Sequence, residues 1–328
     1  MTSNSTIINM TISTVTNSVG IIEVIIAKFV NYLPLLFVIL GLTGFVGNVS
    51  TYLQRELRSN TCCIYSLCGS FADIIHILLN LFANYLKLSH GISAPWLGLT
   101  YLCPLQMMSL GFFPHLSLNF LLMAVIDRYA STCRLTSRIN RINQLKMVPF
   151  CIIITILTSC LASIRSLILY EYRNTSGCTI TKPLTNTLLY IFINGLMQPT
   201  LMFIFVMLTF RNVRKSRQQV APISRNTIPN TYRRSRNRFI TMIFAQILTT
   251  ALLSLQLTIM FSLIYIFIGG LSNLKPGTLL YSFYLLSNYC YYLNNAKAFY
   301  LSLLTSCVFR ETFLQTLFKC RNIWYRHQ

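Results

Sequence analysis

The stretch "LLMAVIDRYASTCR", residues 121–134, sets an acid beside a base at the end of a long apolar run. Asp127 and Arg128 are conspicuous because only 10% of the 328 residues are charged, whereas 54% are hydrophobic. A soluble protein carries about 25% charged residues, so this composition argues against a soluble enzyme. The acid–base pair therefore has to be interpreted relative to a membrane.

Apolar runs of about 20 residues recur along the chain, and each could cross about 30 Å of hydrocarbon as a helix. We expect seven spans, within residues 32–53, 62–86, 100–126, 147–164, 183–210, 239–268 and 278–309. The predicted fold is an all-α membrane protein, a seven-transmembrane helix bundle over residues 30–307. An extracellular segment (1–29) precedes it, and a short amphipathic helix and tail (308–328) follow it.

Basic residues indicate the orientation of this bundle. Most of the 27 Lys and Arg residues lie in three alternate loops and in the C-terminal tail. Cytoplasmic loops retain basic residues, so we expect the C-terminus in the cytoplasm and the N-terminus outside. The net charge of +21 is distributed between apolar spans, which favours contact with anionic membrane lipid over nucleic acid.

Sequons and cysteines agree with that orientation. Asn4, Asn9 and Asn174 stand in N-x-S/T sequons on the expected outer side, where they are candidate glycosylation sites. Of 11 cysteines, only Cys103 and Cys178 fall at expected extracellular positions, where a disulfide persists. The alternative is two unpaired thiols. The N-terminus lacks the basic start and apolar core of a signal peptide, so we expect the first span to direct insertion.

The third span has chemically distinct ends. Cys103 precedes Arg128 by 25 residues, which is about 38 Å of helix, close to a bilayer with its headgroups. This helix therefore carries a cysteine at its outer end and Asp127, Arg128 and Tyr129 at its inner end.

Seven spans, this spacing and the D-R-Y triplet resemble a rhodopsin-like (class A) G protein-coupled receptor, over about residues 30–320. Further resembling positions are Gly47 and Asn48 in "GFVGNVS", Asp73 in "SFADII", Trp96, Pro199, and Phe309 and Cys320 in "VFRETFLQTLFKC". The resemblance implies a plasma-membrane receptor that binds an extracellular ligand and activates heterotrimeric G proteins. It also implies palmitoylation at Cys320.

For Asp127 and Arg128 the resemblance implies a switch, in which Asp127 holds Arg128 at rest and release lets Arg128, with Tyr129, meet the G protein. The alternative is a helix-end ion pair whose side chains extend into the headgroups.

An acid near the middle of a membrane is costly unless it is paired, so Asp73 is a functional candidate. The resemblance implies a sodium site formed by Asn48, Asp73, Ser117, Asn294 and Asn295, and a hard cation does prefer such oxygen ligands. A hydrogen-bonded polar cluster without an ion is an equal alternative. Apart from this candidate sodium ion, we expect no cofactor.

Several receptor motifs are absent. "LSLQ" (Leu253–Gln256) replaces the Cys-Trp-x-Pro motif of helix 6, and either "AFYLS" (298–302) or "NAKAF" (295–299) replaces N-P-x-x-Y of helix 7. Met207 stands where helix 5 usually has a tyrosine, and Arg236 where some receptors place an acid. With Ser302 in helix 7, we therefore expect Asp127 to be the only restraint on Arg128.

Pocket positions carried over from the resemblance suggest the ligand. Leu110 replaces the aspartate of amine receptors, and Lys297 lies five to eight residues from the retinal-binding position, so neither ligand is expected. The pocket candidates are Gln106, Leu110, Thr258, Phe261, Tyr265, Tyr284, Asn288 and Tyr292. Aromatic and amide walls without fixed charge suit a neutral or amidated peptide, although Tyr265 and Tyr284 serve equally well as interfacial anchors. The chain is similar to invertebrate neuropeptide receptors of the FMRFamide-like type.

Other functions are less well supported. A transporter should show an internal repeat, and the chain has none. A metalloenzyme should cluster its ligands, but the four histidines are scattered, and we expect no enzyme activity and no bound metal at such a site. The remaining alternatives are a receptor-like protein that does not couple and a chemosensory receptor for a small molecule.

Overall fold

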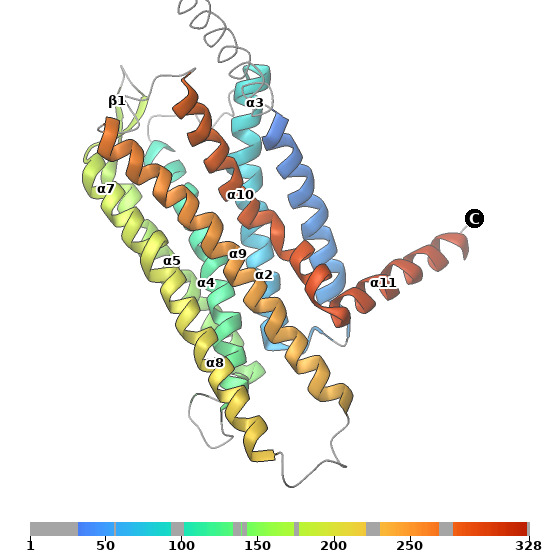
Figure 1. Ribbon diagram of the computed structural model, residues 1–328. Coiled ribbons are helices and arrows are strands. Elements are labelled where there is room, and N and C mark those ends of the chain that lie inside the picture. Colours follow the sequence, from blue (N-terminus) through green and yellow to red (C-terminus); the bar gives the residue numbers. More distant parts are fainter. Residues whose placement is uncertain are drawn as a thin grey trace, which may run out of the picture.

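The computed structural model describes residues 32–55, 57–92, 102–133, 139, 143–173, 177–220, 230–268 and 278–326, and most of them are helical. The first helix, Tyr32–Tyr52, lies beside a rod formed by α2 (Thr61–His76), the π-helical η1 (Ile77–Phe82) and α3 (Ala83–His90) (Figure 1). The following elements are α4 (Cys103–Thr132), η5 (Leu145–Met147), α5 (Val148–Ser163), α6 (Arg165–Leu169), β1 (Tyr170–Arg173), β2 (Gly177–Ile180), α7 (Pro183–Tyr190), the π-helical η6 (Ile191–Met197), α8 (Gln198–Val220), α9 (Asn230–Ile268), α10 (Leu279–Thr305) and α11 (Cys307–Arg326).

Six of the described helical segments are long and apolar enough to cross a membrane. They are Tyr32–Tyr52, Thr61–Lys87, Cys103–Thr132, Leu145–Leu169, Pro183–Arg214 and Met242–Ile264. The helix α10, with 27 residues, has sufficient length for a span. Its asparagines and Lys297 make it more polar than the other six. The predicted all-α membrane architecture is therefore confirmed, with six apolar spans and α10 as a more polar long helix.

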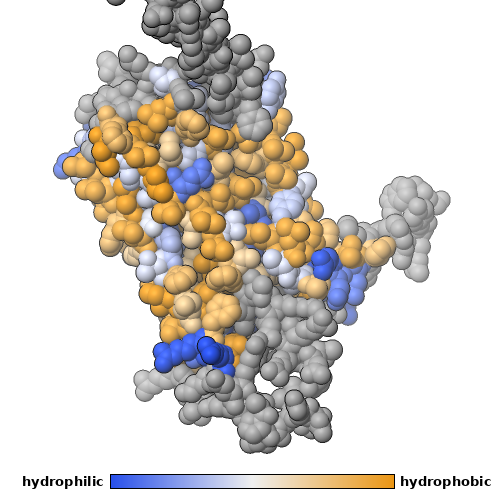
Figure 2. Space-filling model, viewed as in Figure 1, coloured by the Kyte–Doolittle hydropathy of each residue, from blue (hydrophilic) through white to orange (hydrophobic). Residues whose placement is uncertain are grey.

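The distribution of polarity is the reverse of that in a soluble protein. Large aliphatic side chains such as Leu161, Ile168 and Leu304 are 67%, 73% and 74% exposed, whereas Ser159 and Asn194 are buried. Figure 2 shows apolar residues over most of the visible body, with hydrophilic residues in smaller groups at the lower left, at the right and in the middle. Lipid is the solvent that makes such a surface stable, so the chain is a multi-pass membrane protein.

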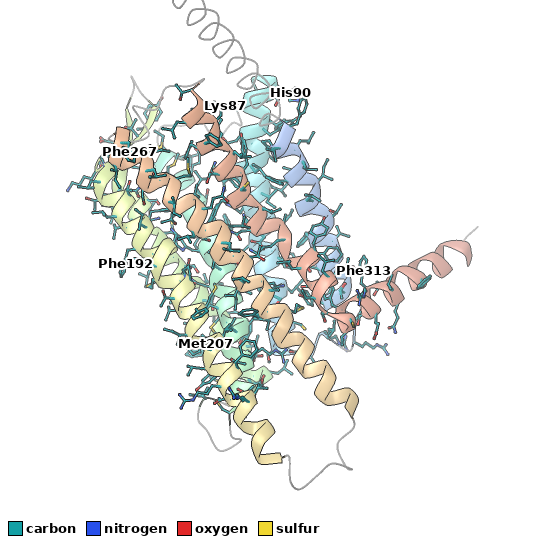
Figure 3. All side chains as sticks on the ribbon, in the orientation of Figure 1. Lys87, His90, Phe192, Met207, Phe267 and Phe313 are labelled. Carbon is teal, nitrogen blue, oxygen red and sulfur yellow. A yellow bond between two sulfur atoms is a disulfide. The ribbon has the colours of Figure 1, made fainter. Side chains whose placement is uncertain are left out.

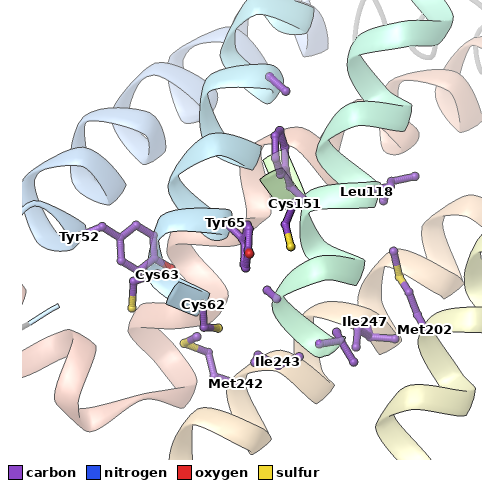
Figure 4. Packing of buried hydrophobic residues seen from close by; sticks show 14 of the residues in the cluster. Tyr52, Cys62, Cys63, Tyr65, Leu118, Cys151, Met202, Met242, Ile243 and Ile247 are labelled. Carbon is purple, nitrogen blue, oxygen red and sulfur yellow. The ribbon is translucent and has the colours of Figure 1, made fainter. Parts of the chain in front are cut away.

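The helix α4 occupies the middle of the bundle, where it contacts α2, α5, α6 and α8, while α10 packs against α9 and α2 (Figure 1). The main core surrounds the inner half of α4. In Figure 4, Tyr65 of α2, Leu118 of α4 and Cys151 of α5 converge with methionine and isoleucine side chains from α8 and α9. This packing fixes the rotation of α4 and so determines which of its polar residues face inward.

A glycine permits close packing between the first helix and α10. A Cβ atom added to Gly47 would lie 2.3 Å from Cε2 of Phe299, which is far inside van der Waals contact. The ring of Phe299 also packs edge-on against Phe309 and Phe313 of α11. Gly47, one of the resembling positions in "GFVGNVS", thus allows Phe299 to contact both α11 and the first helix.

The predicted disulfide between Cys103 and Cys178 is confirmed. The strands β1 and β2 pair antiparallel, with Tyr172 opposite Cys178, and the disulfide joins β2 to the first residue of α4. This bond holds the hairpin against one end of the bundle.

Three predicted boundaries require correction. The helix containing the D-R-Y triplet continues to Thr132, beyond the end of the predicted apolar span at residue 126, because its last residues pack against α2 and α8. Arg165 was predicted to follow the fourth span, but the span continues through α6 to Leu169. The C-terminal helix α11 covers 20 residues and is longer than the predicted segment 308–320.

Candidate functional site

Side chains from α2 surround the D-R-Y triplet at the inner end of α4. The fully buried Asp127 accepts a hydrogen bond of 2.6 Å from the hydroxyl of Thr61. Arg128 donates through Nη2 to Oδ1 of Asn60, also at 2.6 Å. Tyr129 packs edge-on against Phe205 of α8, with ring centroids 5.8 Å apart.

This geometry corrects the expectation that Asp127 alone restrains Arg128. Asn60 is the N-cap of α2, where its side-chain oxygen accepts from the backbone N–H of Cys62 and from the guanidinium of Arg128. One amide oxygen therefore joins the start of α2 to the inner end of α4. Sequence reasoning missed Asn60 and Thr61, although an asparagine directly before an apolar helix is a recognisable capping signal.

Two of the replaced switch positions lie away from Arg128. Met207 is 54% exposed and points outward from α8, on the same outer side as Phe192 (Figure 3). Val206 and Thr209 of α8 instead line a small cavity beside Arg128. Ser302 is fully buried and accepts a 3.0 Å hydrogen bond from Nε2 of Gln246, which links α10 to α9. The side chain of Arg236 lies outside the described part of the chain.

A polar cluster fills the middle of the bundle, as predicted. Asp73, Ser117, Asn294 and Asn295 line one cavity of about 40 Å³ between α2, α4 and α10. Asn48 is adjacent to it, because its amide donates a 2.8 Å hydrogen bond to Ser70, which lines the same cavity. This volume is large enough for a few water molecules.

Lys297 also enters this cluster, although it was not among the five residues predicted to form it. Its side chain is only 8% exposed, it lines the cavity with Asp73, and its ammonium donates to both the backbone and the side-chain oxygen of Asn294. The positive charge of Lys297 also acts on the carboxylate of Asp73. In a site of low polarity this ammonium supplies the positive charge that a bound cation would otherwise provide.

The described residues therefore do not fit a sodium ion well. Lys297 takes the carbonyl oxygen of Asn294 and would repel a second cation in the same small cavity. One oxygen of Asp73 has no hydrogen-bond partner among the described residues, so the cluster retains an acceptor that water can satisfy.

A second cavity, of about 140 Å³, lies between this cluster and the disulfide end of the bundle. Four predicted pocket residues line it: Leu110, Phe261, Asn288 and Tyr292. Its lining also includes Arg165, His76, His115, Tyr190, Asn194 and Tyr291, none of which was predicted.

The other predicted pocket residues lie elsewhere. Gln106 lines a separate hollow near the start of α4, and Thr258 is buried with its hydroxyl bonded to the backbone of Ser254. Tyr284 packs edge-on against Phe261 at 5.7 Å and so supports the wall of the second cavity from behind. The side chain of Tyr265 lies outside the described part of the chain.

Arg165 is the one charged side chain in the lining of the second cavity. Its Nη1 reaches the backbone oxygen of Asn186 at 3.5 Å, and its guanidinium carbon lies 5.6 Å from the centre of the Tyr190 ring. Burial raises the pKa of the nearby Tyr170 phenol on β1, so this group remains a neutral hydroxyl. The cavity is therefore electropositive, which corrects the expectation of walls without fixed charge.

Some predicted positions cannot be placed. The sequons at Asn4, Asn9 and Asn174, and Trp96, lie outside the described residues. Cys320 belongs to α11, but its side chain is outside the described part.

Neither models of protein families nor curated protein sequences show a match to this chain.

Proposed function

We propose that this chain is a seven-helix receptor of the rhodopsin-like type, which binds an extracellular ligand and activates heterotrimeric G proteins. In this proposal α10 is the seventh span, and the disulfide end of the bundle faces the outside of the plasma membrane. The basic loops then face the cytoplasm.

The observation that carries the proposal is the arrangement along α4. This single helix begins at the disulfide, lines the 140 Å³ cavity with Leu110 and His115, and carries Arg128 close to its other end. A change in the cavity can reach Arg128 through one rigid element that packs against four neighbours. Such a path supports signalling across a membrane more directly than it supports transport.

The contact between Arg128 and Asn60 supports a resting state. Asn60 caps α2, so any movement of α4 away from α2 breaks this hydrogen bond and weakens the hold of α2 on the guanidinium. Heterotrimeric G proteins are the partners that the D-R-Y resemblance implies for a freed arginine.

The test is basal signalling by the full-length chain in cells, measured as G protein recruitment without added ligand. We expect Asn60→Ala and Asp127→Asn to raise basal recruitment severalfold, because each removes a contact that holds the inner end of α4. We expect Arg128→Ala to reduce recruitment to that of cells without the receptor. Asn60→Asp, which retains both the cap and the partner for Arg128, is the matched control.

A different result would favour the alternative of a receptor-like protein that does not couple. Equal recruitment by wild type, Asn60→Ala, Asp127→Asn and Arg128→Ala, at equal surface expression, would contradict coupling. The hydrogen bond between Gln246 and Ser302 is the observation that favours this alternative, because it ties α9 to α10 where coupled receptors carry other motifs.

A further inference from the structure

We infer that the 140 Å³ cavity binds its ligand through a carboxylate group held by Arg165. This inference rests on the proposed function, in which that cavity is the ligand site. It replaces the neutral or amidated ligand expected from the resemblance with an anionic one.

Arg165 itself has no strong partner among the described residues. Its best hydrogen bond among the described residues is the 3.5 Å contact with a backbone oxygen, and its Nε has no partner there. No Asp or Glu of the described part forms an ion pair with it. A guanidinium inside a membrane span is costly, and such residues usually pair with an anion or mark a ligand pathway. An anionic ligand would complete this site.

The side chains that surround Arg165 in the cavity carry several hydrogen-bond donors. Asn194, Asn288 and the hydroxyls of three tyrosines (Tyr190, Tyr291, Tyr292) supply hydrogen-bond donors to the lining, which contains no carboxylate. His115 is 2% exposed, and its Nδ1 has no partner among the described residues. Donors gathered around a planar guanidinium match a carboxylate, which arginine binds through two parallel hydrogen bonds.

The size and polarity of the cavity also limit which ligand can fit. The volume of about 140 Å³ exceeds the space required by one water molecule about tenfold. Leu110, Leu257 and Phe261 form an apolar wall in the same cavity. The fitting ligand thus combines a carboxylate with a small apolar or aromatic group. A free organic acid and the C-terminal residue of a non-amidated peptide both have this chemistry.

The experiment measures ligand-induced thermal stabilisation of the full-length protein in lipid nanodiscs. The probes are matched pairs: acetate with acetamide, phenylacetate with phenylacetamide, and a short peptide ending in phenylalanine as free acid and as amide. We expect the acids to raise Tm at concentrations about 10- to 100-fold lower than their amides, as a charge-assisted hydrogen bond would produce. Comparison of phenylacetate with the free-acid peptide distinguishes the two ligand sources.

Variants assign this preference to one side chain. Arg165→Gln should abolish the difference between acid and amide, Arg165→Lys should retain it in weaker form, and Arg310→Gln on the exposed surface of α11 should leave it unchanged. An acid preference that survives Arg165→Gln would overturn the inference. So would a failure of every acid to stabilise the wild-type protein better than its amide.

The Tm of a variant in the absence of ligand tests whether Arg165 has a purely structural role. Arg165→Met keeps an unbranched side chain and removes the charge, so the ligand-free protein should be as stable as wild type or more stable. A marked fall in Tm would mean that Arg165 stabilises the fold itself, contrary to the inference. Neither binding nor stability depends on a G protein, so these results are independent of the coupling test.

Discussion

Arg128 and Arg165 are half-buried arginines at opposite ends of the same bundle, and their surroundings differ. Arg128 donates at 2.6 Å to a side chain of the neighbouring helix α2, whereas the closest acceptor of Arg165 is a backbone oxygen at 3.5 Å. The first arginine stabilises a contact between helices that movement can break. The second faces a cavity of about 140 Å³, where a contact can still be made by a molecule from outside.

The two ends of α4 are also held by different forces. At the outer end Cys103 is covalently joined to the hairpin, while at the inner end Thr61 and Asn60 hold Asp127 and Arg128 through hydrogen bonds. A covalent anchor does not respond to movement, but hydrogen bonds are exchangeable. The inner end is therefore the one suited to change its state.

The largest expected effect comes from removing the disulfide between Cys103 and Cys178. Cys178→Ser removes the disulfide and should destabilise the protein by about 2–5 kcal/mol, because the hairpin is no longer tied to α4. Thermal unfolding of the purified protein and its surface expression are the measurements. Cys160→Ser, at a half-buried free cysteine of α5, is the control. Equal losses in the two variants would show that the outer end does not depend on the disulfide.

A second test concerns the cluster between the two ends. Lys297→Met leaves the carboxylate of Asp73 without its positive neighbour and should cost about 3 kcal/mol, whereas the double variant with Asp73→Asn should recover most of this loss. Sodium should stabilise Lys297→Met more than wild type, since the competing ammonium is gone. Additive losses and an equal sodium effect would contradict the role assigned to Lys297.

The smallest expected effect sharpens the description of the inner end. Thr61→Val removes the donor to the buried carboxylate of Asp127 and should cost about 1–2 kcal/mol. Thr155→Val is a matched control, because Thr155 is equally buried but donates only to the backbone oxygen of Cys151. If the two variants have the same Tm, Thr61 contributes nothing through Asp127.

Features of the structure that depend on the chemical type of a residue could be predicted from the sequence. The cysteine pair followed from the side of the membrane on which each residue is expected to lie, and the polar cluster followed from an acid within an apolar run. The spacing between Cys103 and Arg128 indicated one helix with two distinct ends, which α4 confirms. In each case the constraint was local or depended only on distance along a helix.

Features that depend on the rotation of a helix about its axis, or on where a helix ends, could not be predicted. The fourth span was predicted to end at residue 164, just before Arg165, although α6 continues the helix and turns this residue inward. Counting along the chain could not show that Met207 faces outward, because packing against α4 and α9 fixes the rotation of α8. Lys297 reaches Asp73 for the same reason, through the rotation of α10.

Gly195 of η6 is in close contact with Thr258, which lies near one end of the long helix α9. A Cβ on Gly195 would lie 2.8 Å from Cγ2 of Thr258, so the two helices touch almost without intervening side chain. Phe261, in the cavity wall, is three residues beyond Thr258, about 4.5 Å along the helix, whereas Asn230 is 28 residues before it, about 42 Å. If α9 tilts about this point, a shift at Phe261 is enlarged about ninefold at the Asn230 end of the helix.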